Sequence, residues 1–307
     1  MQPGNRLEAV KRLFASEDEV TIGKNTLRVE EVAALFFRHM QQRATAAGVL
    51  EPLDAAVVTI PANSRGKARY RTKVSAGLAG IEVLALINEP TAAAMAHARA
   101  LGQNERILVF DWGGGTLDVT VLQAIEGTFI EQASRGIQRL GGMDIDREFF
   151  KAVRDLAGGS EAWSEAERNT FKLDLERAKI QLSSQSSTQI RYPNGQFREV
   201  GRAEFEEAIR PLVERTREPV ETCLRDSPGP IDHLVMVGGS SKMPVIQRFV
   251  SDIVRTDVSV GIDPMTAIAE GAAVASGILA GTIDDLASPF RVFTPSELGA
   301  SAKVPVL

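Results

Sequence analysis

Several kinds of residue are scarce in this chain, and each scarcity narrows the classes of protein to which it can belong. The 307 residues include one cysteine, so no internal disulfide can form, and the three histidines show no zinc-type spacing. No uninterrupted apolar run reaches the roughly 20 residues that span a membrane, and the N-terminus lacks a signal-peptide core. We therefore expect a cytoplasmic protein with no membrane partner.

A strong excess of one charge is also lacking. Lysine and arginine number 35 against 40 for aspartate and glutamate, which gives a net charge of −5. Nucleic-acid binding depends on a basic face, so we expect no nucleic-acid partner. The chain is 44% hydrophobic and 24% charged, which is typical of a globular protein with one large bilobed domain or two small ones.

The sequence does contain short apolar strands that alternate with helical segments. Apolar runs predict strands at 55–60, 83–87, 106–110, 117–122 and 231–237, and Pro193-Asn194-Gly195 predicts the turn of a hairpin over 188–200. Helices are predicted at 29–49, 65–78, within 144–182, at 202–224 and at 264–279. In the first of these helices, Val32, Leu35, Phe36 and Met40 fall along one side. This alternation predicts an α/β protein.

One glycine-rich turn joins two predicted strands. In Asp111-Trp112-Gly113-Gly114-Gly115-Thr116, three successive positions lack side chains, so backbone N–H groups can approach an anion and Thr116 adds a hydroxyl. Asp111 and Asp118 flank the turn with carboxylates suited to a hydrated Mg²⁺. The alternative is a hairpin whose glycines only satisfy φ.

Three other short segments allow a functional and a plain interpretation. Gly238-Gly239-Ser240-Ser241-Lys242 joins a strand to a helix, which suits phosphate or ribose or is a simple connector. Gly141-Gly142 precedes an acidic helix start, which also fits a capped helix. Glu89 lies between a strand and Pro90, where it could orient a water molecule or interact with the helix dipole.

Taken in this order, the motifs resemble those of the seventy-kilodalton heat-shock chaperone (DnaK) family. The similar stretches include 57–98 with INEPTAAA, FDWGGGTLDVTVL at 110–122, LGGMDID at 140–146, LERAKIQLSS at 175–184 and LVMVGGSSKMPVIQ at 234–247. The resemblance covers about residues 8–281. INEPTAAA separates this family from sugar kinases and filament-forming actin relatives.

The resemblance implies a two-lobed actin-like (ribonuclease-H-like) ATPase fold that binds ATP or ADP with Mg²⁺. Its implied parts are an incomplete first lobe at 1–104, a second lobe at 105–260 with a helical and hairpin subdomain at 145–227, a returning helix at 261–281 and a linker-like tail at 282–307. The first lobe is expected to be incomplete because the match starts after the family's first phosphate loop and its two flanking strands. An unpaired strand at 55–60 would then be an exposed edge, so we expect a fragment, a misplaced start or a chain that needs a partner.

The resemblance also assigns roles to individual residues. The catalytic residues are expected to be Lys11, Glu89, Asp111 and Thr116, with Asp111 and Asp118 holding Mg²⁺ through water. The nucleotide is expected to contact Gly113, Gly114, Gly115, Gly141, Gly142, Glu176, Lys179, Ser183, Gly238, Gly239, Ser240 and Lys242. Pro61 and Arg69 match a relay that reports the nucleotide state.

Three positions differ from the family pattern. Lys242 replaces the arginine that stacks on adenine, Ile180 replaces an arginine, and Met265 replaces an acid. A lysine ammonium cannot stack as a planar guanidinium does, so these changes weaken the predicted adenosine contacts.

The expected function is a nucleotide-dependent molecular chaperone ATPase domain of the stress response, which couples ATP hydrolysis to protein folding. A peptide-binding domain, co-chaperones and a nucleotide-exchange factor are the partners that the resemblance implies. One alternative is a non-hydrolysing regulatory relative that has lost turnover. Another, which INEPTAAA disfavours, is a cytoskeletal actin-like filament protein.

Overall fold

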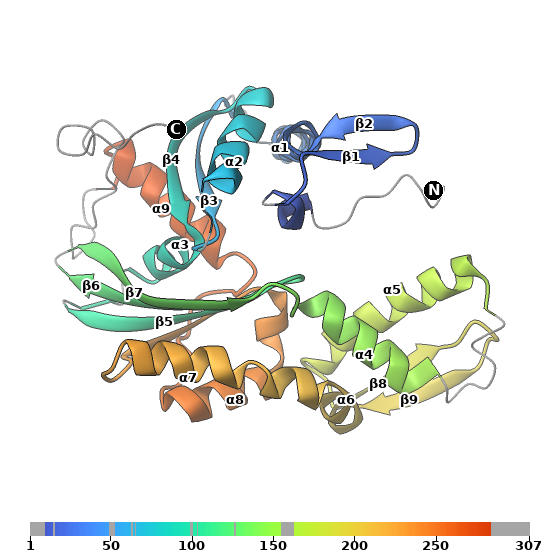
Figure 1. Cartoon of the computed structure of the whole chain (residues 1–307). Helices are drawn as coiled ribbons and strands as arrows, with labels where there is room; N and C mark the ends of the chain where they lie inside the picture. Colours follow the sequence, from blue (N-terminus) through green and yellow to red (C-terminus); the bar gives the residue numbers. More distant parts are fainter. Residues whose placement is uncertain are drawn as a thin grey trace. The chain divides into compact units, whose positions relative to one another are not determined.

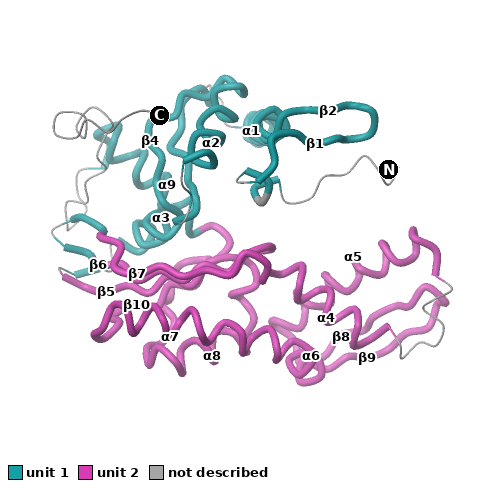
Figure 2. The backbone as a smooth tube through the Cα atoms, in the orientation of Figure 1, with its two compact units in different colours: residues 1–103, 124–129, 267–307 teal, residues 104–123, 130–266 magenta. Residues whose placement is uncertain are grey.

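The structure is a computed structural model that describes residues 10–14, 16–48, 53–62, 64, 66–98, 101–102, 104–125, 127–154 and 163–283. These residues form two compact units (Figure 2). The first unit takes its described residues from 1–103, 124–129 and 267–307, and the second takes them from 104–123 and 130–266. The linker-like tail expected at 282–307 lies outside the described residues from residue 284 onward.

The first unit is built on two parallel strands with helices on both faces (Figure 1). β3 (Ala55–Ile60) pairs with β4 (Glu82–Asn88), and their register sets Ile60 opposite Asn88. Parallel strands need a crossover connection, and α2 (Lys67–Leu78) supplies it. On the other face lie α3 (Glu89–Ala96) and α9 (Ala267–Leu279), which pack closely against each other. This packing fixes the position of Glu89, the first residue of α3.

The helix α1 (Val29–Ala46) confirms the predicted helix, but its buried side differs from the predicted one. The buried residues are Val29, Val32, Ala33 and Ala34. Leu35, Phe36 and Met40 are instead 54%, 58% and 63% exposed. The apolar stripe of α1 is wider than the surface that its neighbours cover, so the sequence pattern overestimated the buried face.

A small N-terminal part of the first unit was not predicted from the sequence. It consists of the 3-10 helix η1 (Val10–Leu13) and an antiparallel hairpin of β1 (Glu19–Ile22) and β2 (Asn25–Arg28). Each of these strands is only four residues long. Exposed and half-buried positions alternate along β1, and β2 is mostly exposed, so the apolar pattern is too short to mark either strand.

The second unit contains a sheet with the strand order β10-β5-β6-β7. Its strands are β5 (Glu105–Trp112), β6 (Leu117–Ile125), β7 (Thr128–Ile137) and β10 (His233–Val237). β5 is buried from Ile107 to Phe110, as expected for a central strand whose two faces are covered. The outer strand β7 was not predicted, because most of its side chains are exposed.

The rest of the second unit is helical, with one hairpin. Its elements are α4 (Gly142–Arg154), α5 (Glu165–Leu182), β8 (Ser187–Arg191), β9 (Phe197–Gly201), α6 (Arg202–Glu214), α7 (Arg217–Asp226), the 3-10 helix η5 (Gly239–Lys242) and α8 (Pro244–Val254). A capping box starts α5, since Glu167 N donates to Ser164 Oγ at 3.3 Å and Ser164 N donates to the Glu167 carboxylate at 2.8 Å. The hairpin β8–β9 confirms the predicted turn, in which Gly195 has a φ of 85°.

The chain's single cysteine, Cys223, is buried in the core of the second unit. Its thiol donates to the carbonyl of Val119 at 3.3 Å, and burial raises the pKa of Cys223 to about 12. Within the described residues, none of the helices is both long and apolar enough to cross a membrane.

Candidate functional site

Two loops leave parallel strands at the same edge of the sheet in the second unit. β5 ends at Trp112 and β10 ends at Val237, and their register places Val237 opposite Asp111. The loop Gly113–Gly115 therefore lies next to the loop that begins at Gly238. In α/β proteins, the carboxyl ends of parallel strands are where ligands are usually held.

A third glycine segment, Gly141-Gly142, packs directly on Gly113–Gly115. Gly142 N donates to Gly113 O at 3.0 Å, and Met143 N donates to Gly114 O at 2.9 Å. A Cβ atom on Gly141 would lie 2.4 Å from Gly115 N and 2.5 Å from the carbonyl carbon of Gly114, so only glycine fits there. The loop Gly113–Gly115 is thus fixed by the backbone of the segment that contains Gly141 and Gly142.

Gly142 marks the point at which several predicted site residues meet. From the position of a Cβ atom on Gly142, Ser240 Oγ is 3.2 Å away, the Cα of Gly114 is 3.5 Å away and Lys179 Nζ is 3.8 Å away. Ser240 Oγ also donates to Gly113 O at 3.2 Å. Four stretches that are far apart in the sequence therefore converge within the second unit.

The glycines of the first loop are not explained by backbone strain. The described glycines with a positive φ do not include Gly113, Gly114 or Gly115, and Gly113 N donates to Thr116 O at 3.1 Å to close the turn. A Cβ atom on Gly114 would meet no protein atom within 4 Å. The interpretation as a turn whose glycines only satisfy φ is therefore not supported, and Gly114 leaves open space beside the loop.

Gly238 has a different reason to be glycine. Its φ is 84°, and a Cβ atom there would lie 2.5 Å from the carbonyl oxygen of Trp112. The close approach brings the start of the η5 loop against the end of β5. Ser241 is buried beneath it and donates to Val237 O at 2.6 Å, which fixes the loop to its strand.

Two carboxylates flank the first loop. The Asp111 Oδ1 atom lies 4.0 Å from the position of a Cβ atom on Gly113, so this carboxylate turns toward the glycines. The Asp118 carboxylate lies beside Gly136 of β7, where a Cβ atom would come within 2.7 Å of Asp118 Oδ1. Gly136 therefore leaves the room that Asp118 occupies. No group of three His, Cys, Asp or Glu residues gathers as a metal site within the described residues.

Glu176 and Lys179 of α5 and Ser183, the C-cap residue that follows it, lie at spacings that place them on one side. Lys179 Nζ donates to Asp146 Oδ1 at 2.6 Å, with the two side chains 13% and 28% exposed. Burial raises the pKa of Asp146 above its usual value, since desolvation outweighs the attraction of the ammonium. Ser183 Oγ donates to Lys179 O at 3.3 Å.

Lys242 at the end of η5 is already paired. Its Nζ lies 2.8 Å from Asp263 Oδ1, and this contact holds the pKa of Asp263 below its usual value, with a hydrogen bond from Met265 N adding to the effect. Met265 is 63% exposed, and its sulfur lies 3.1 Å from the position of a Cβ atom on Gly239. Ile180, the third position that differs from the family pattern, is 62% exposed.

In the first unit, Lys11 and Glu89 form an ion pair. Lys11 Nζ donates to Glu89 Oε1 at 2.6 Å, and the side chains are 57% and 13% exposed. Glu89 is the first residue of α3 and Pro90 the second, one position later than predicted. Glu89 is therefore also placed to interact with the helix dipole, so both interpretations of this residue remain open.

The structure thus gathers the predicted residues into two groups. Lys11 and Glu89 meet in the first unit, while the glycine loops, the two aspartates and the α5 residues belong to the second unit. Pro61 directly follows β3 and Arg69 lies within α2, so the predicted relay falls in the first unit.

Three residues of the second unit were missed by the sequence analysis. Gly136 makes room for Asp118, Asp146 pairs with Lys179, and Asp144 accepts from Gly141 N at 2.8 Å. Asp144 is 7% exposed and also pairs with Arg147, so the contacts support the plain interpretation of Gly141-Gly142 as a capped helix start. Its signal was the acidic pair that follows the glycines.

These residues define a mixed α/β protein in which three glycine segments meet near the carboxyl ends of two parallel strands. The family model described as "Hsp70 protein" matches residues 13–299. The chain therefore belongs to the Hsp70 family, to which DnaK also belongs, and the matched part is that family's nucleotide-binding region. The resemblance inferred from the sequence motifs is confirmed.

Individual relatives give the same result. The chain is 35% identical over 297 residues to the chaperone protein DnaK of Mycoplasmopsis agalactiae, with 91% of this chain and 49% of that protein covered. It is 35% identical over 299 residues to the chaperone protein DnaK of Cenarchaeum symbiosum, covering 92% and 45%. For that of Prochlorococcus marinus, the identity is 38% over 273 residues, covering 84% and 43%. The chain spans about half the length of the curated relatives it matches.

Proposed function

We propose that this chain is a two-lobed, actin-like domain that binds ATP or ADP with Mg²⁺ and hydrolyses ATP as part of a molecular chaperone. The observation that carries the proposal is the convergence around Gly142, where Gly114, Lys179 and Ser240 meet within 4 Å. A set of glycine segments and a cation at the carboxyl ends of parallel strands suits a phosphate-bearing ligand.

The second unit would hold the nucleotide. The backbone of Gly113, Gly114 and Gly115 would line the phosphates, and the open space beside Gly114 allows close approach. Glu176, Lys179 and Ser183 of α5, with Gly238, Gly239 and Ser240 of the opposite loop, would contact the adenosine, and Gly141 and Gly142 support the first loop. The Thr116 hydroxyl would contact the terminal phosphate.

The carboxylates of Asp111 and Asp118 fit a hydrated Mg²⁺. Both are oxygen donors of the kind that the ion prefers, and the lack of a side chain at Gly136 leaves room for the Asp118 carboxylate. When bound, Mg²⁺ neutralises negative charge on the phosphates. The two carboxylates themselves would orient the surrounding water shell.

The first unit would supply the groups for hydrolysis. Glu89 would orient the attacking water through its carboxylate, and Lys11 would contact the terminal phosphate with its ammonium. Their 2.6 Å ion pair brings the two side chains together.

A non-hydrolysing relative is the second candidate, and one observation favours it. Lys242 is engaged by Asp263 at 2.8 Å, and Ile180 and Met265, the two other departures from the family pattern, are exposed apolar side chains instead of charged groups. Weak adenosine contacts would lower occupancy and with it turnover. A cytoplasmic location, together with a peptide-binding domain, co-chaperones and an exchange factor as partners, stays a prediction.

Calorimetric titration with Mg-ADP tests the binding step. We expect binding by the unmodified chain, loss of binding in Asp111→Ala, and unchanged binding in Asp252→Ala, which removes an exposed carboxylate of α8 in the same unit. Equal affinities for all three proteins would contradict the proposed site.

Phosphate release under single-turnover conditions tests the hydrolysis step. Glu89→Gln should retain Mg-ADP affinity and lose turnover, because the amide is a poor acceptor for a water proton. If the unmodified chain binds nucleotide and releases no phosphate above background, the non-hydrolysing relative is the correct assignment.

A further inference from the structure

Arg71 of α2 is a buried cation that the proposed mechanism does not use. Its side chain is only 5% exposed, whereas Lys67 and Lys73 of the same helix are exposed. Burying an isolated charge is costly, so the position of Arg71 requires several partners.

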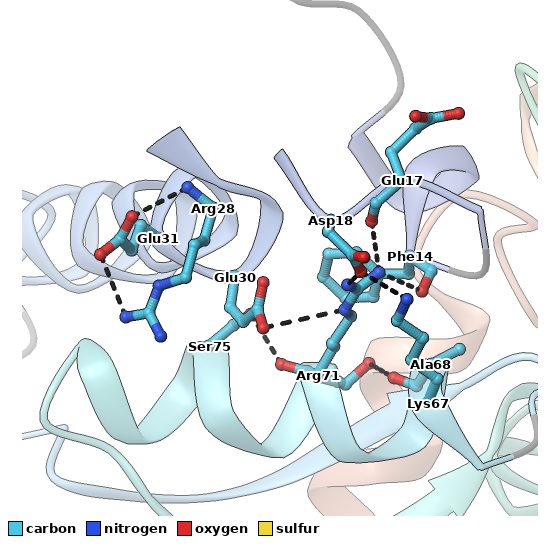
Figure 3. A network of polar contacts seen from close by, with 11 residues as sticks. Phe14, Glu17, Asp18, Arg28, Glu30, Glu31, Lys67, Ala68, Arg71 and Ser75 are labelled. Atoms are coloured by element: carbon cyan, nitrogen blue, oxygen red, sulfur yellow. Dashed lines mark hydrogen bonds and ion pairs between the residues drawn. The ribbon is translucent and has the colours of Figure 1, made fainter. Parts of the chain in front are cut away.

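The partners of Arg71 come from outside its own helix (Figure 3). Its Nη1 atom donates to the carbonyl of Phe14 at 2.9 Å and to the carbonyl of Glu17, and its Nη2 atom donates to the Asp18 carboxylate. Its Nε atom lies 3.7 Å from the Glu30 carboxylate of α1. One guanidinium therefore connects α2 with α1 and with the chain that follows η1.

Two of these contacts are made to the backbone directly after the turn that carries Lys11. Phe14 is the residue that follows η1, and its N–H donates to Lys11 O at 3.4 Å. Glu17 N donates to Leu13 O at 2.9 Å, so the carbonyl that Arg71 holds belongs to a residue bonded back to the same turn. Arg71 thus binds the residue that directly follows η1, Phe14, and a second residue, Glu17, that is hydrogen-bonded to the last residue of η1.

The apolar contacts of η1 leave its axial position undetermined. Val10 and Leu13 pack on a small cluster of Phe14, Val29 and Ala33. Apolar contacts of this kind are non-directional, whereas the planar fork of a guanidinium fixes its acceptors in direction and distance. The polar contacts of Arg71 are therefore what define where the turn sits.

We propose that Arg71 is a positioning residue, which fixes η1 so that the Lys11 ammonium is held at Glu89. The inference rests on the proposed function, in which Lys11 and Glu89 act on the terminal phosphate and its attacking water. Loss of Arg71 would let η1 shift, and a displacement of about 1 Å at a catalytic group lowers turnover by up to roughly a hundredfold. Nucleotide affinity would persist, because the nucleotide-holding residues belong to the second unit.

The test uses variants chosen so that folding is retained. Arg71→Met alone would leave the Glu30 carboxylate buried without its cation, and Glu30 Oε2 already lacks a hydrogen-bond partner within the described residues. The double variant Arg71→Met/Glu30→Gln removes both charges together. Lys73→Met, which removes an exposed cation two residues further along α2, is the matched control.

The first measurement is a thermodynamic cycle on turnover. Arg71→Met/Glu30→Gln should reduce single-turnover hydrolysis by roughly tenfold or more, leave the Mg-ADP dissociation constant within about twofold, and have no further effect in a Lys11→Met background. Lys73→Met should match the unmodified chain. An equal loss of turnover with and without Lys11 would show a general structural role and overturn the proposal.

A second measurement does not depend on hydrolysis, so it separates failure of this proposal from failure of the proposed function. Reductive methylation is carried out on the folded protein, and its rate at Lys11 is followed by mass spectrometry. This rate should rise severalfold in Arg71→Met/Glu30→Gln, because the ammonium is released from Glu89. Lys73→Met should leave that rate unchanged. If the rate at Lys11 is the same in the double variant and the unmodified chain, Arg71 does not position Lys11.

Discussion

Gly271 of α9 lies directly against the backbone of Ala92 in α3. A Cβ atom on Gly271 would come within 1.6 Å of the Ala92 carbonyl oxygen and 2.4 Å of its carbonyl carbon. Only a residue without a side chain allows the two helices to approach so closely. This contact connects the helix near the end of the described chain to the helix that begins at Glu89.

Gly271→Ala should therefore destabilise the first unit. The two helices would have to separate to admit a methyl group, which costs about 3 kcal/mol when the obstacle is backbone. Urea unfolding measures the loss. Gly77→Ala in α2 is the matched control: a Cβ atom there meets nothing within 4 Å, so the substitution should stabilise the chain by about 0.5–1 kcal/mol.

Gly141→Ala and Gly114→Ala should both lower nucleotide affinity but should differ in stability. A methyl group on Gly141 would collide with the backbone of Gly114 and Gly115, so we expect a loss of about 1–3 kcal/mol in stability together with a loss of Mg-ADP binding. Gly114→Ala places its methyl group in open space, so stability should be retained while nucleotide affinity falls. Calorimetry and denaturant unfolding of the two variants give the answer; retained affinity in Gly114→Ala would mean that the phosphates lie elsewhere.

Lys179→Met should destabilise the second unit by about 1–3 kcal/mol, because it leaves the half-buried Asp146 carboxylate without its cation. The pKa of Asp146 is already raised by burial and should rise further. A raised folded pKa means that protonation favours the fold, so the loss should be smaller at pH 5 than at pH 8. Asp146→Asn in the same background should restore most of the stability, and a failure to do so would contradict this account.

Asp18 should make stability depend on acid. Hydrogen bonds from Lys67 first, and then Arg71, hold the pKa of Asp18 below its ordinary value. The contribution of the Asp18 carboxylate to the free energy of unfolding is therefore fully present above the unfolded pKa of about 3.9. It disappears as the pH falls through the lower folded pKa. Melting temperatures of the unmodified chain and Asp18→Asn should differ by a constant amount from pH 5 to 8 and converge in stronger acid. A difference that widens on acidification would refute the assignment.

Much of the second unit could be predicted from the sequence because its signals are local. The buried strands β5, β6 and β10 are rich in apolar residues, and a glycine directly follows both β5 and β10. The hairpin β8–β9 follows from Pro193-Asn194-Gly195. The motifs that carry the family resemblance lie on these same elements, so the gathering of Gly113, Gly142 and Ser240 was expected before their geometry was known.

Other features depend on contacts that no local pattern encodes. The apolar stripe of α1 predicts a buried side, but whether Leu35, Phe36 and Met40 are covered depends on neighbours elsewhere in the chain. Gly136 is an isolated glycine in an exposed strand, and its role becomes visible only beside Asp118. The pairing of Lys242 with Asp263 joins residues 21 positions apart, so no local sequence pattern predicts it.

The environment of Cys223 has a practical consequence for spectroscopy. Its thiol is buried and has a pKa of about 12, so almost none of it is thiolate at neutral pH and maleimide dyes should react with it very slowly. The natural chain can therefore serve as the background for fluorophore labelling without first replacing its cysteine. One new surface cysteine on each compact unit would then be enough to follow, by energy transfer, whether added nucleotide changes the distance between them.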